Sequence, residues 1–395
     1  MINAPGSALP IICAAQFAFS PRPTASQIMA MRANIGAVGV RIDVPWADTE
    51  LSPGVYAIPA YVDGLIAAVR ASGCDIVLVL GYGNPLHPGS GAWNLPPRDQ
   101  ASWNAFANYA AFVATQYPWA WIEIYNEPNN PQFWANAINP VQYAGLLSTC
   151  INKLRSIPNI GASLKIITAG VGPALSEDDQ NPFMKAVAGA VGSATMAKLS
   201  AHAIHPYDAS SPPEALLPFV ERYRAAVPCS APLVVTEWGW CSPWLGGDEN
   251  KRALYVARAI GCAVIAGVAL VAIFSLHDTG ADATNLEMTF GLHRFDQTPK
   301  LAARAVNLMT TALAGTVTYD AEKVGSVYRI TLRKDGGSVT KIIWSDGPVT
   351  SITEPMGSVQ WVDDSNGTRP WHRYMPGGLM ITIGSTIAPQ IITGT

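Results

Sequence analysis

Charged residues are scarce in this sequence. Asp, Glu, Lys and Arg make up 13% of its 395 residues, about half of the ~25% found in ordinary soluble domains. Hydrophobic residues make up 49%, so the chain can bury a large core and is not largely disordered. The formal net charge is −3, and no cluster of Lys and Arg occurs. Because a basic patch is missing, nucleic acid is excluded as a partner.

Motifs for metals, nucleotides and disulfides are also missing. The six cysteines are scattered, with no Cys-x-x-Cys and no paired Cys/His spacing, which predicts neither a zinc site nor a disulfide framework. Cys229 and Cys241 are separated by a predicted strand of ~16 Å, which is too long for a disulfide. No Gly-x-Gly-x-x-Gly motif follows any predicted strand. We therefore expect no metal and no cofactor.

Features of membrane insertion or export are weak. Residues 1–17 have no basic stretch before their apolar segment and so do not resemble a signal peptide. Residues 259–276 form an uncharged run of 18 residues, which is the threshold length for a spanning helix. Gly267 divides this run, which favours an amphipathic helix over 250–266 followed by a buried strand from residue 268. We expect no membrane span.

The sequence does contain an alternation of short apolar runs and helical patterns, which predicts parallel βα units. Eight strands are expected, over residues 10–17, 37–44, 75–82, 119–127, 165–171, 199–207, 232–240 and 268–278. Eight such units match a (β/α)8 TIM barrel, an α/β fold whose active site lies at the carboxyl ends of its strands. A doubly wound sheet is the alternative, but no phosphate-binding loop supports it.

The pattern changes from Gly315 onward. Short alternating runs are separated there by turn signals such as Asp335-Gly336-Gly337 and Asp346-Gly347-Pro348, and no helical pattern occurs. Turns at this density predict an antiparallel β unit that forms a small β-sandwich. We expect a catalytic barrel over residues 1–314 and an accessory β-sandwich over 315–395.

Two glutamates stand at the carboxyl ends of predicted strands. Glu127 ends the fourth strand and Glu237 lies in the seventh, 110 residues later, which is three βα units of about 37 residues each. In a closed barrel of eight strands, the fourth and seventh lie across the mouth from one another. Both carboxyl groups can therefore point into one pocket, as in glycosidases, where two carboxylates flank the scissile bond.

The sequence around these glutamates resembles a known family. The run YNEPNNPQFWANAINPVQYAGLL (125–147) is similar to the acid/base region of clan A retaining glycoside hydrolases, in particular family 39 and related bacterial polysaccharide hydrolases. Further matches are GVRIDVPWADTELSPGVY (39–56), HAIHPY (202–207), VVTEWGW (234–240) and FGLHRFDQTPKLAARAV (290–306). The resemblance spans residues 37–306 and implies cleavage of β-glycosidic bonds in an oligo- or polysaccharide by double displacement.

The resemblance also implies roles for individual residues. Glu127 would be the general acid/base, with a raised pKa in the free enzyme, and Glu237 would be the nucleophile. Asn126 would bind the sugar 2-hydroxyl next to the cleaved bond. Arg41 would orient the nucleophile, although a structural ion pair with Asp43 is the alternative.

Other matched positions line the expected pocket. His205 and Tyr207 share one face of the sixth strand and would lie beside Glu237, whereas His202 has the opposite parity and is expected to be packed. The clan commonly has an aromatic residue after the eighth strand, where this chain offers Phe274 or His277. The flat rings that follow strand ends and could stack on sugars include Trp46, Trp93, Trp134, Trp238, Trp240 and Trp244.

Two other functions stay open at this stage. A carbohydrate-binding protein on a degenerate barrel would have lost a catalytic carboxylate, and both are present. A metal-dependent barrel hydrolase would need a ligand set that the first strand lacks, since it carries no His-x-His. A polysaccharide substrate would favour a secreted or periplasmic protein. The sugar, the linkage, endo or exo action and the oligomeric state are not encoded in a readable motif.

Overall fold

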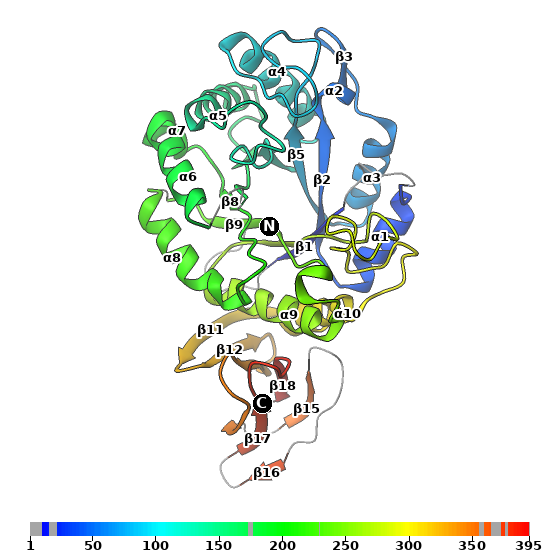
Figure 1. The fold of residues 1–395 in the computed structure, drawn as a ribbon, viewed down its shortest axis with the longest axis vertical. Helices are drawn as coiled ribbons and strands as arrows, with labels where there is room; N and C mark the ends of the chain where they lie inside the picture. The colour runs from blue at the N-terminus through cyan, green and yellow to red at the C-terminus, as the bar shows by residue number, and fades with distance from the viewer. Residues whose placement is uncertain are drawn as a thin grey trace.

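The computed structural model describes residues 10–15, 22–172, 177–228, 230–354, 359–364, 373–375 and 378–394. These residues form two parts, a barrel of parallel strands surrounded by helices and a smaller antiparallel unit beside it (Figure 1). Cys229 lies outside the described residues, as does most of the segment compared with a signal peptide.

Eight parallel strands form the barrel, as the sequence predicts. They are β1 (Ile11–Ala14), β2 (Gly39–Pro45), β5 (Asp75–Gly81), β6 (Trp121–Ile124), β7 (Lys165–Thr168), β8 (His202–Ile204), β9 (Leu233–Trp238) and β10 (Val271–Ile273). Hydrogen-bonded neighbours follow the order β7-β6-β5-β2-β1-β10-β9-β8. A parallel bridge between Ile167 and Ala201 closes the ring between β7 and β8. Neighbouring strands are consecutive in the chain, which is the topology of a (β/α)8 barrel.

Helices connect successive strands and cover the outside of the barrel (Figure 1). They are α1 (Ala25–Asn34), α3 (Ala60–Ala71), α4 (Gln100–Gln116), α5 (Pro140–Arg155), α6 (Glu177–Val191), α8 (Leu216–Ala226), α9 (Glu249–Ile265) and α10 (Leu301–Leu313). Short elements lie in the loops: α2 (Trp46–Thr49), α7 (Ser193–Met196), η1 (Pro213–Ala215), η2 (Pro243–Leu245) and the hairpin of β3 (Glu50–Ser52) and β4 (Val55–Tyr56).

The long uncharged run divides as the sequence predicts. Helix α9 ends at Ile265, and Gly267 has a φ of 61°, a left-handed conformation that glycine adopts without steric cost. The chain then enters β10 at Val271, whose residues are buried on both faces. None of the helices in the described part of the chain is long and apolar enough to cross a membrane.

The C-terminal part consists of two antiparallel sheets, as the sequence predicts. One sheet has the order β11-β12-β13-β18-β15 and the other β14-β17-β16. Their strands are β11 (Thr316–Val324), β12 (Val327–Lys334), β13 (Val339–Ser345), β14 (Thr350–Glu354), β15 (Val359–Asp364), β16 (Arg373–Met375), β17 (Gly378–Ile383) and β18 (Gln390–Gly394). Side chains from both sheets form one buried cluster, which includes Ile343, Leu379, Ile381, Ile383 and Ile392. This arrangement is a small β-sandwich.

A buried polar cluster joins the two parts. Arg258 of α9 pairs with Glu214 of η1 through both nitrogens of its fork, at 2.7 and 2.6 Å. The indole of Trp344 in β13 donates to the same glutamate at 2.8 Å. Arg258 also donates to the backbone carbonyl of Ser385 at 3.0 Å. We call these residues the junction cluster, and because each contact crosses between elements, it fixes the β-sandwich against α9.

Candidate active site

Glu127 is held over the barrel mouth by an unusual backbone. Tyr125 and Glu127 follow β6 with positive φ angles of 74° and 42°, a conformation that non-glycine residues adopt rarely and mostly at functional sites. The Glu127 amide donates to the carbonyl of Gly170 at 3.0 Å. Asn129 and Gly172 exchange two further hydrogen bonds, of 2.5 and 3.1 Å. These contacts tie the segment after β6 to the end of β7.

The same neighbouring strand end leaves room for the glutamate. A Cβ added at Gly172 would lie 2.5 Å from the carboxyl group of Glu127, and one at Gly170 would lie 2.0 Å from the ring of His205. Real Cβ atoms do not approach other atoms this closely. Both glycines are therefore required by the close approach of these side chains.

Glu237 lies at the end of β9 and faces two donors. Arg41 of β2 donates through Nη1 to Oε1, and the Tyr207 hydroxyl donates to Oε2 at 3.1 Å. Burial and the negative charge of Glu237 raise the pKa of Tyr207 well above its ordinary value, so the phenol keeps its proton. Arg41 also donates to Oδ1 of Asn126 at 2.9 Å. The structure thus brings together four of the residues that the sequence singles out.

Arg41 has a different ion-pair partner from the one suggested by the sequence. Its guanidinium makes a two-pronged contact with Glu123 of β6, with Nε to Oε2 at 2.7 Å and Nη2 to Oε1 at 3.2 Å. Glu123 is fully buried and also accepts from the Gly170 amide and the Thr236 hydroxyl, each at 3.0 Å. It therefore links β2, β6, β9 and the end of β7 beneath the carboxylates of Glu127 and Glu237.

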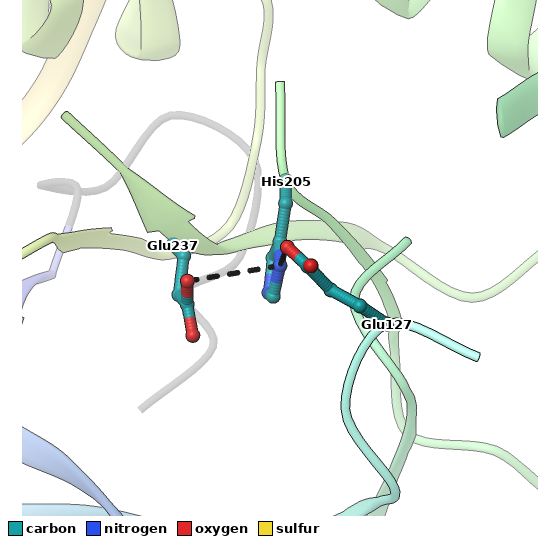
Figure 2. Close-up of side chains that lie close together, drawn as sticks. All are labelled: Glu127, His205 and Glu237. Atoms are coloured by element: carbon teal, nitrogen blue, oxygen red, sulfur yellow. Dashed lines mark hydrogen bonds and ion pairs between the residues drawn. The ribbon is translucent and has the colours of Figure 1, made fainter. Parts of the chain in front are cut away.

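His205 lies between the two glutamates (Figure 2). Its Nδ1 is 2.8 Å from Oε1 of Glu127 and 3.9 Å from Oε2 of Glu237, and the side chain has no exposed surface. Its Nε2 contacts the hydroxyl of Thr236 at 2.9 Å. His202, in contrast, is buried away from this pocket, and burial lowers its pKa to about 4, in agreement with the packed role that its parity predicts.

The surroundings of Glu127 oppose the expectation of a raised pKa. Burial raises the pKa of this carboxyl, but the hydrogen bond and charge of His205 and the amide of Asn130, 2.7 Å away, outweigh it. The pKa of Glu127 therefore lies below its ordinary value, and the expectation is wrong for this side chain alone. Oε1 of Glu127 and Nδ1 of His205 lie 2.8 Å apart, so one proton can be shared between them.

Two predicted sugar contacts are wrong. Trp46 and Trp134 have no exposed surface, so neither can stack on a ligand. Trp46 is covered by the ring of His87, whose centroid is 4.7 Å away, and its indole donates to the buried carboxylate of Glu50 at 2.6 Å. Trp134 packs edge to face against Tyr125. Both rings stabilise the loops that surround the mouth.

Two further aromatic predictions have a mixed outcome. Trp238 is 3% exposed and lies beside Leu216 and Phe219 around a small cavity next to α8, so it packs on the outer side of β9. Phe274 is 8% exposed and follows β10 at the mouth. Its ring contacts that of Tyr207, the residue that donates to Glu237. A sugar contact for Phe274 stays a prediction.

The sequence does not predict the contacts of several other residues at the site. Glu123 and Thr236 have no motif of their own, although a glutamate inside a strand that is apolar on both sides is itself a signal. Asp43 lies close enough to Glu237 for its charge to matter, and accepts from the Tyr82 hydroxyl at 3.4 Å. Trp93 is 54% exposed and packs edge to face against Tyr82.

One group of side chains could also hold a divalent cation. Single ligand atoms of Glu127, His205 and Glu237 all lie within 4.8 Å of one another. Two carboxylates and an imidazole suit several divalent metals. The same atoms already bond to one another, to Arg41 and to Tyr207, and a cation would have to displace that arrangement.

Comparisons with known proteins find similarity in structure and not in sequence. No protein-family model and no curated protein matches the chain. A family 39 glycoside hydrolase from Bacteroides cellulosilyticus WH2 superposes with a TM-score of 0.79 at 20% identity, over 98% of this chain and 81% of that one. The catalytic domain of family 30 xylanase C from Talaromyces cellulolyticus gives 0.68 at 13% identity, over 99% and 98%. A β-xylosidase from Caulobacter crescentus CB15 gives 0.62 at 15% identity, over 91% and 79%. The chain therefore has the fold of these glycoside hydrolases.

Proposed function

We propose that this protein is a retaining glycoside hydrolase that cleaves β-glycosidic bonds in an oligo- or polysaccharide. The observation that carries the proposal is the separation of two carboxylates across the mouth, with one oxygen of Glu127 within 4.8 Å of one of Glu237. Retaining enzymes have carboxyl groups about 5–5.5 Å apart, whereas inverting enzymes leave about 6.5–9.5 Å for a water molecule.

In the first step, Glu237 acts as nucleophile. Its carboxylate forms a bond to the anomeric carbon while the bond from that carbon to the glycosidic oxygen breaks. Glu127 passes to the departing oxygen the proton that it shares with Nδ1 of His205, 2.8 Å away. The glycosyl-enzyme ester is then neutral at Glu237, so Arg41 and Tyr207 lose the charge that they stabilise in the free enzyme.

In the second step, water replaces the leaving group. Glu127, now ionised, accepts a proton from the water as its oxygen attacks the anomeric carbon, and the ester bond to Glu237 breaks. Loss of the negative charge on Glu237 during the first step also removes its repulsion of an ionised Glu127, one of whose oxygens lies within 4.8 Å. Glu127 can thus serve as acid and then as base.

Three residues are suited to holding the sugar. Oδ1 of Asn126 accepts from Arg41, which turns its amide nitrogen toward a sugar hydroxyl. Phe274 supplies an apolar surface beside Tyr207. Trp93 offers an exposed ring farther out, and sugars stack on such faces. The similar structures include a xylanase, a β-xylosidase and an endo-β1,6-glucanase, which favours a neutral β-linked glycan. We assign catalysis to residues 1–314 and an accessory role to 315–395.

Hydrolysis of aryl β-glycosides and a panel of polysaccharides tests the proposal, with the first anomer formed identified by NMR. The wild type should release product with retained configuration. Glu237→Ala should lose activity by about 10⁴-fold or more, and azide should restore turnover as a glycosyl azide of inverted configuration. Glu214→Gln is the matched control, because it alters a buried glutamate of the junction cluster and should keep kcat/KM.

The alternatives give different outcomes. A non-catalytic carbohydrate-binding barrel would bind glycans with no hydrolysis on any of them. A metal-dependent hydrolase would lose activity on chelation and regain it with a divalent cation. Inverted configuration in the first product would also overturn the retaining assignment.

A further inference from the structure

The chain of hydrogen bonds beneath Glu127 has a defined direction. Glu123 accepts from Nε and Nη2 of Arg41, from the Gly170 amide and from the Thr236 hydroxyl. Three of these four bonds reach the same oxygen, Oε1. A guanidinium and an amide can only donate. Glu123 is therefore an acceptor at every contact and has no proton to give to Thr236.

The direction of the next bond follows from this. A threonine hydroxyl has one proton, and here it is donated to Oε1 of Glu123 at 3.0 Å. The contact of 2.9 Å between Thr236 and Nε2 of His205 must then use a lone pair of the hydroxyl oxygen. Nε2 of His205 consequently carries a hydrogen in every protonation state of the site.

The opposite ring nitrogen faces Glu127. With a hydrogen fixed on Nε2, a neutral His205 presents the lone pair of Nδ1 to Oε1 of Glu127 at 2.8 Å. An ionised Glu127 opposite that lone pair would be repelled. One proton is therefore needed between Nδ1 and Oε1, either on the carboxyl group or on the imidazole.

We infer that Thr236 and Glu123 are positioning residues that lock the tautomer of His205 and thereby keep the acid proton on the Glu127–His205 pair. Neither residue can contact a sugar, since both are fully buried. The inference rests on the proposed function for its catalytic consequence, whereas the tautomer itself is a property of the resting protein.

Several charged groups surround His205. Among the described residues, the titratable or charged groups that face it include Glu123, Glu127 and Glu237, the ring of Tyr207, and Arg41 behind the glutamates. Three carboxylates lie within 4.0 Å of the ring. Removing the lock would leave these charges in place, so a change in behaviour could be assigned to the tautomer.

The variant Thr236→Val tests the lock. Valine keeps the shape of threonine but cannot accept from Nε2, so a neutral His205 can move its hydrogen to Nδ1 and donate to an ionised Glu127. The pair then loses its proton more easily, and the basic limb of kcat/KM against pH should move down by about one unit. Thr236→Ser keeps the hydroxyl and should restore the wild-type limb.

The design separates this effect from general damage. Thr168→Val removes another fully buried hydroxyl of the barrel, which accepts from the Ala203 amide at 2.9 Å, and should leave the basic limb unchanged. The acidic limb, which reports the nucleophile, should stay in place in all three variants. An unchanged basic limb in folded Thr236→Val would overturn the inference.

Nitrogen NMR of the imidazole gives a readout that needs no activity. In the wild type, Nε2 of His205 should have the shift of a protonated nitrogen at every pH at which the protein is folded, with the signal assigned by His205→Gln. An unprotonated Nε2 would overturn the inference even if the enzyme is active. A protonated Nε2 in a protein that hydrolyses no glycan would instead overturn the proposed function and leave the lock standing.

Discussion

Two buried arginines organise this molecule, and their surroundings differ in charge balance. At the junction cluster, Arg258 pairs with a single carboxylate, Glu214, through both prongs of its fork. At the mouth, Arg41 forms ion pairs with both Glu123 and Glu237, and Asp43 and Glu127 lie close by. The junction is neutral as a pair, whereas the mouth has more carboxylates than cations.

The difference separates a structural from a reactive use of the same interaction. A balanced, fully buried pair needs no further partner and can hold two elements together. An excess of carboxylates raises the free energy of the folded state unless a proton, a cation or a substrate relieves it. Substitutions can change the charge balance at the junction cluster or at the mouth. At the junction they should affect stability alone, and at the mouth they should also affect catalysis.

The largest effect is expected from Arg41→Met. It leaves Glu123 buried without its ion-pair partner, which should lower the free energy of unfolding by about 3–5 kcal/mol. It also removes a donor from Glu237, and kcat/KM should fall by about 10²–10³-fold or more. Thermal unfolding and aryl-glycoside kinetics measure the two effects. Arg41→Lys keeps the charge without the fork, so its stability and kcat/KM should lie between those of the wild type and Arg41→Met. An activity of Arg41→Met within a factor of ten of the wild type would contradict the assigned role.

Arg258→Met should cost similar stability without a loss of catalysis. Glu214 would be left buried without its partner, again at about 3–5 kcal/mol, so the thermal midpoint should fall clearly. Below that midpoint kcat/KM should match the wild type, because no reacting group contacts the junction cluster. The double variant Glu214→Leu with Arg258→Met removes both charges and should recover part of the loss. A catalytic defect at an unchanged thermal midpoint would show that the two regions are coupled.

The sequence is sufficient to predict the barrel and the meeting of Glu127 and Glu237 at its mouth, because both leave a periodic or positional signature. Eight apolar runs separated by helical patterns predict parallel strands, and three units between Glu127 and Glu237 place them across the mouth. Arg41 was also found, but its partner Glu123 was not. A choice between Asp43 and Glu123 depends on where side chains meet in space, 82 positions apart in the chain, and no local pattern encodes that.

The predictions for the tryptophans were wrong in part for a related reason. Trp46 and Trp93 both follow strand ends, so their positions in the sequence are equivalent. Trp46 is buried because His87 and Glu50, from two different loops, close over it, whereas Trp93 lies at the surface. Which ring is covered is decided by packing between loops, and the hydrophobic pattern of one loop does not contain that information.

A smaller effect on stability is expected from Asp43→Asn at the mouth. Burial, with Glu237 and Glu123 nearby, raises the pKa of Asp43 from 3.8 to about 6 despite Arg41. The folded protein thus binds this proton more tightly than the unfolded chain, and stability falls as pH rises from about 4 to about 6. The variant should gain on the order of 1–3 kcal/mol at pH 7 and nothing at pH 4.

Thermal unfolding of this variant across that pH range, against the exposed control Asp335→Asn, measures the effect. Equal midpoints for wild type and Asp43→Asn at pH 7 would mean that the excess of carboxylates at the mouth carries no stability cost, and the contrast with the junction cluster would then be one of geometry alone.

The same contrast extends to aromatic rings and gives the smallest expected effect. Trp344 at the junction is buried and donates to Glu214, whereas Trp93 at the mouth is half exposed beside Tyr82. If Trp93 stacks on a distant sugar unit, Trp93→Ala should raise KM for an oligosaccharide by about 3–10-fold, as for ~0.5–1.5 kcal/mol of ring stacking. An aryl monoglycoside is too short to reach it and should be cleaved as by the wild type. Trp119→Ala, at the opposite end of β6 where the ring packs under Arg70, is the control. Equal losses on both substrates would place Trp93 in the support of the loops, with Trp46 and Trp134, and not in contact with the glycan.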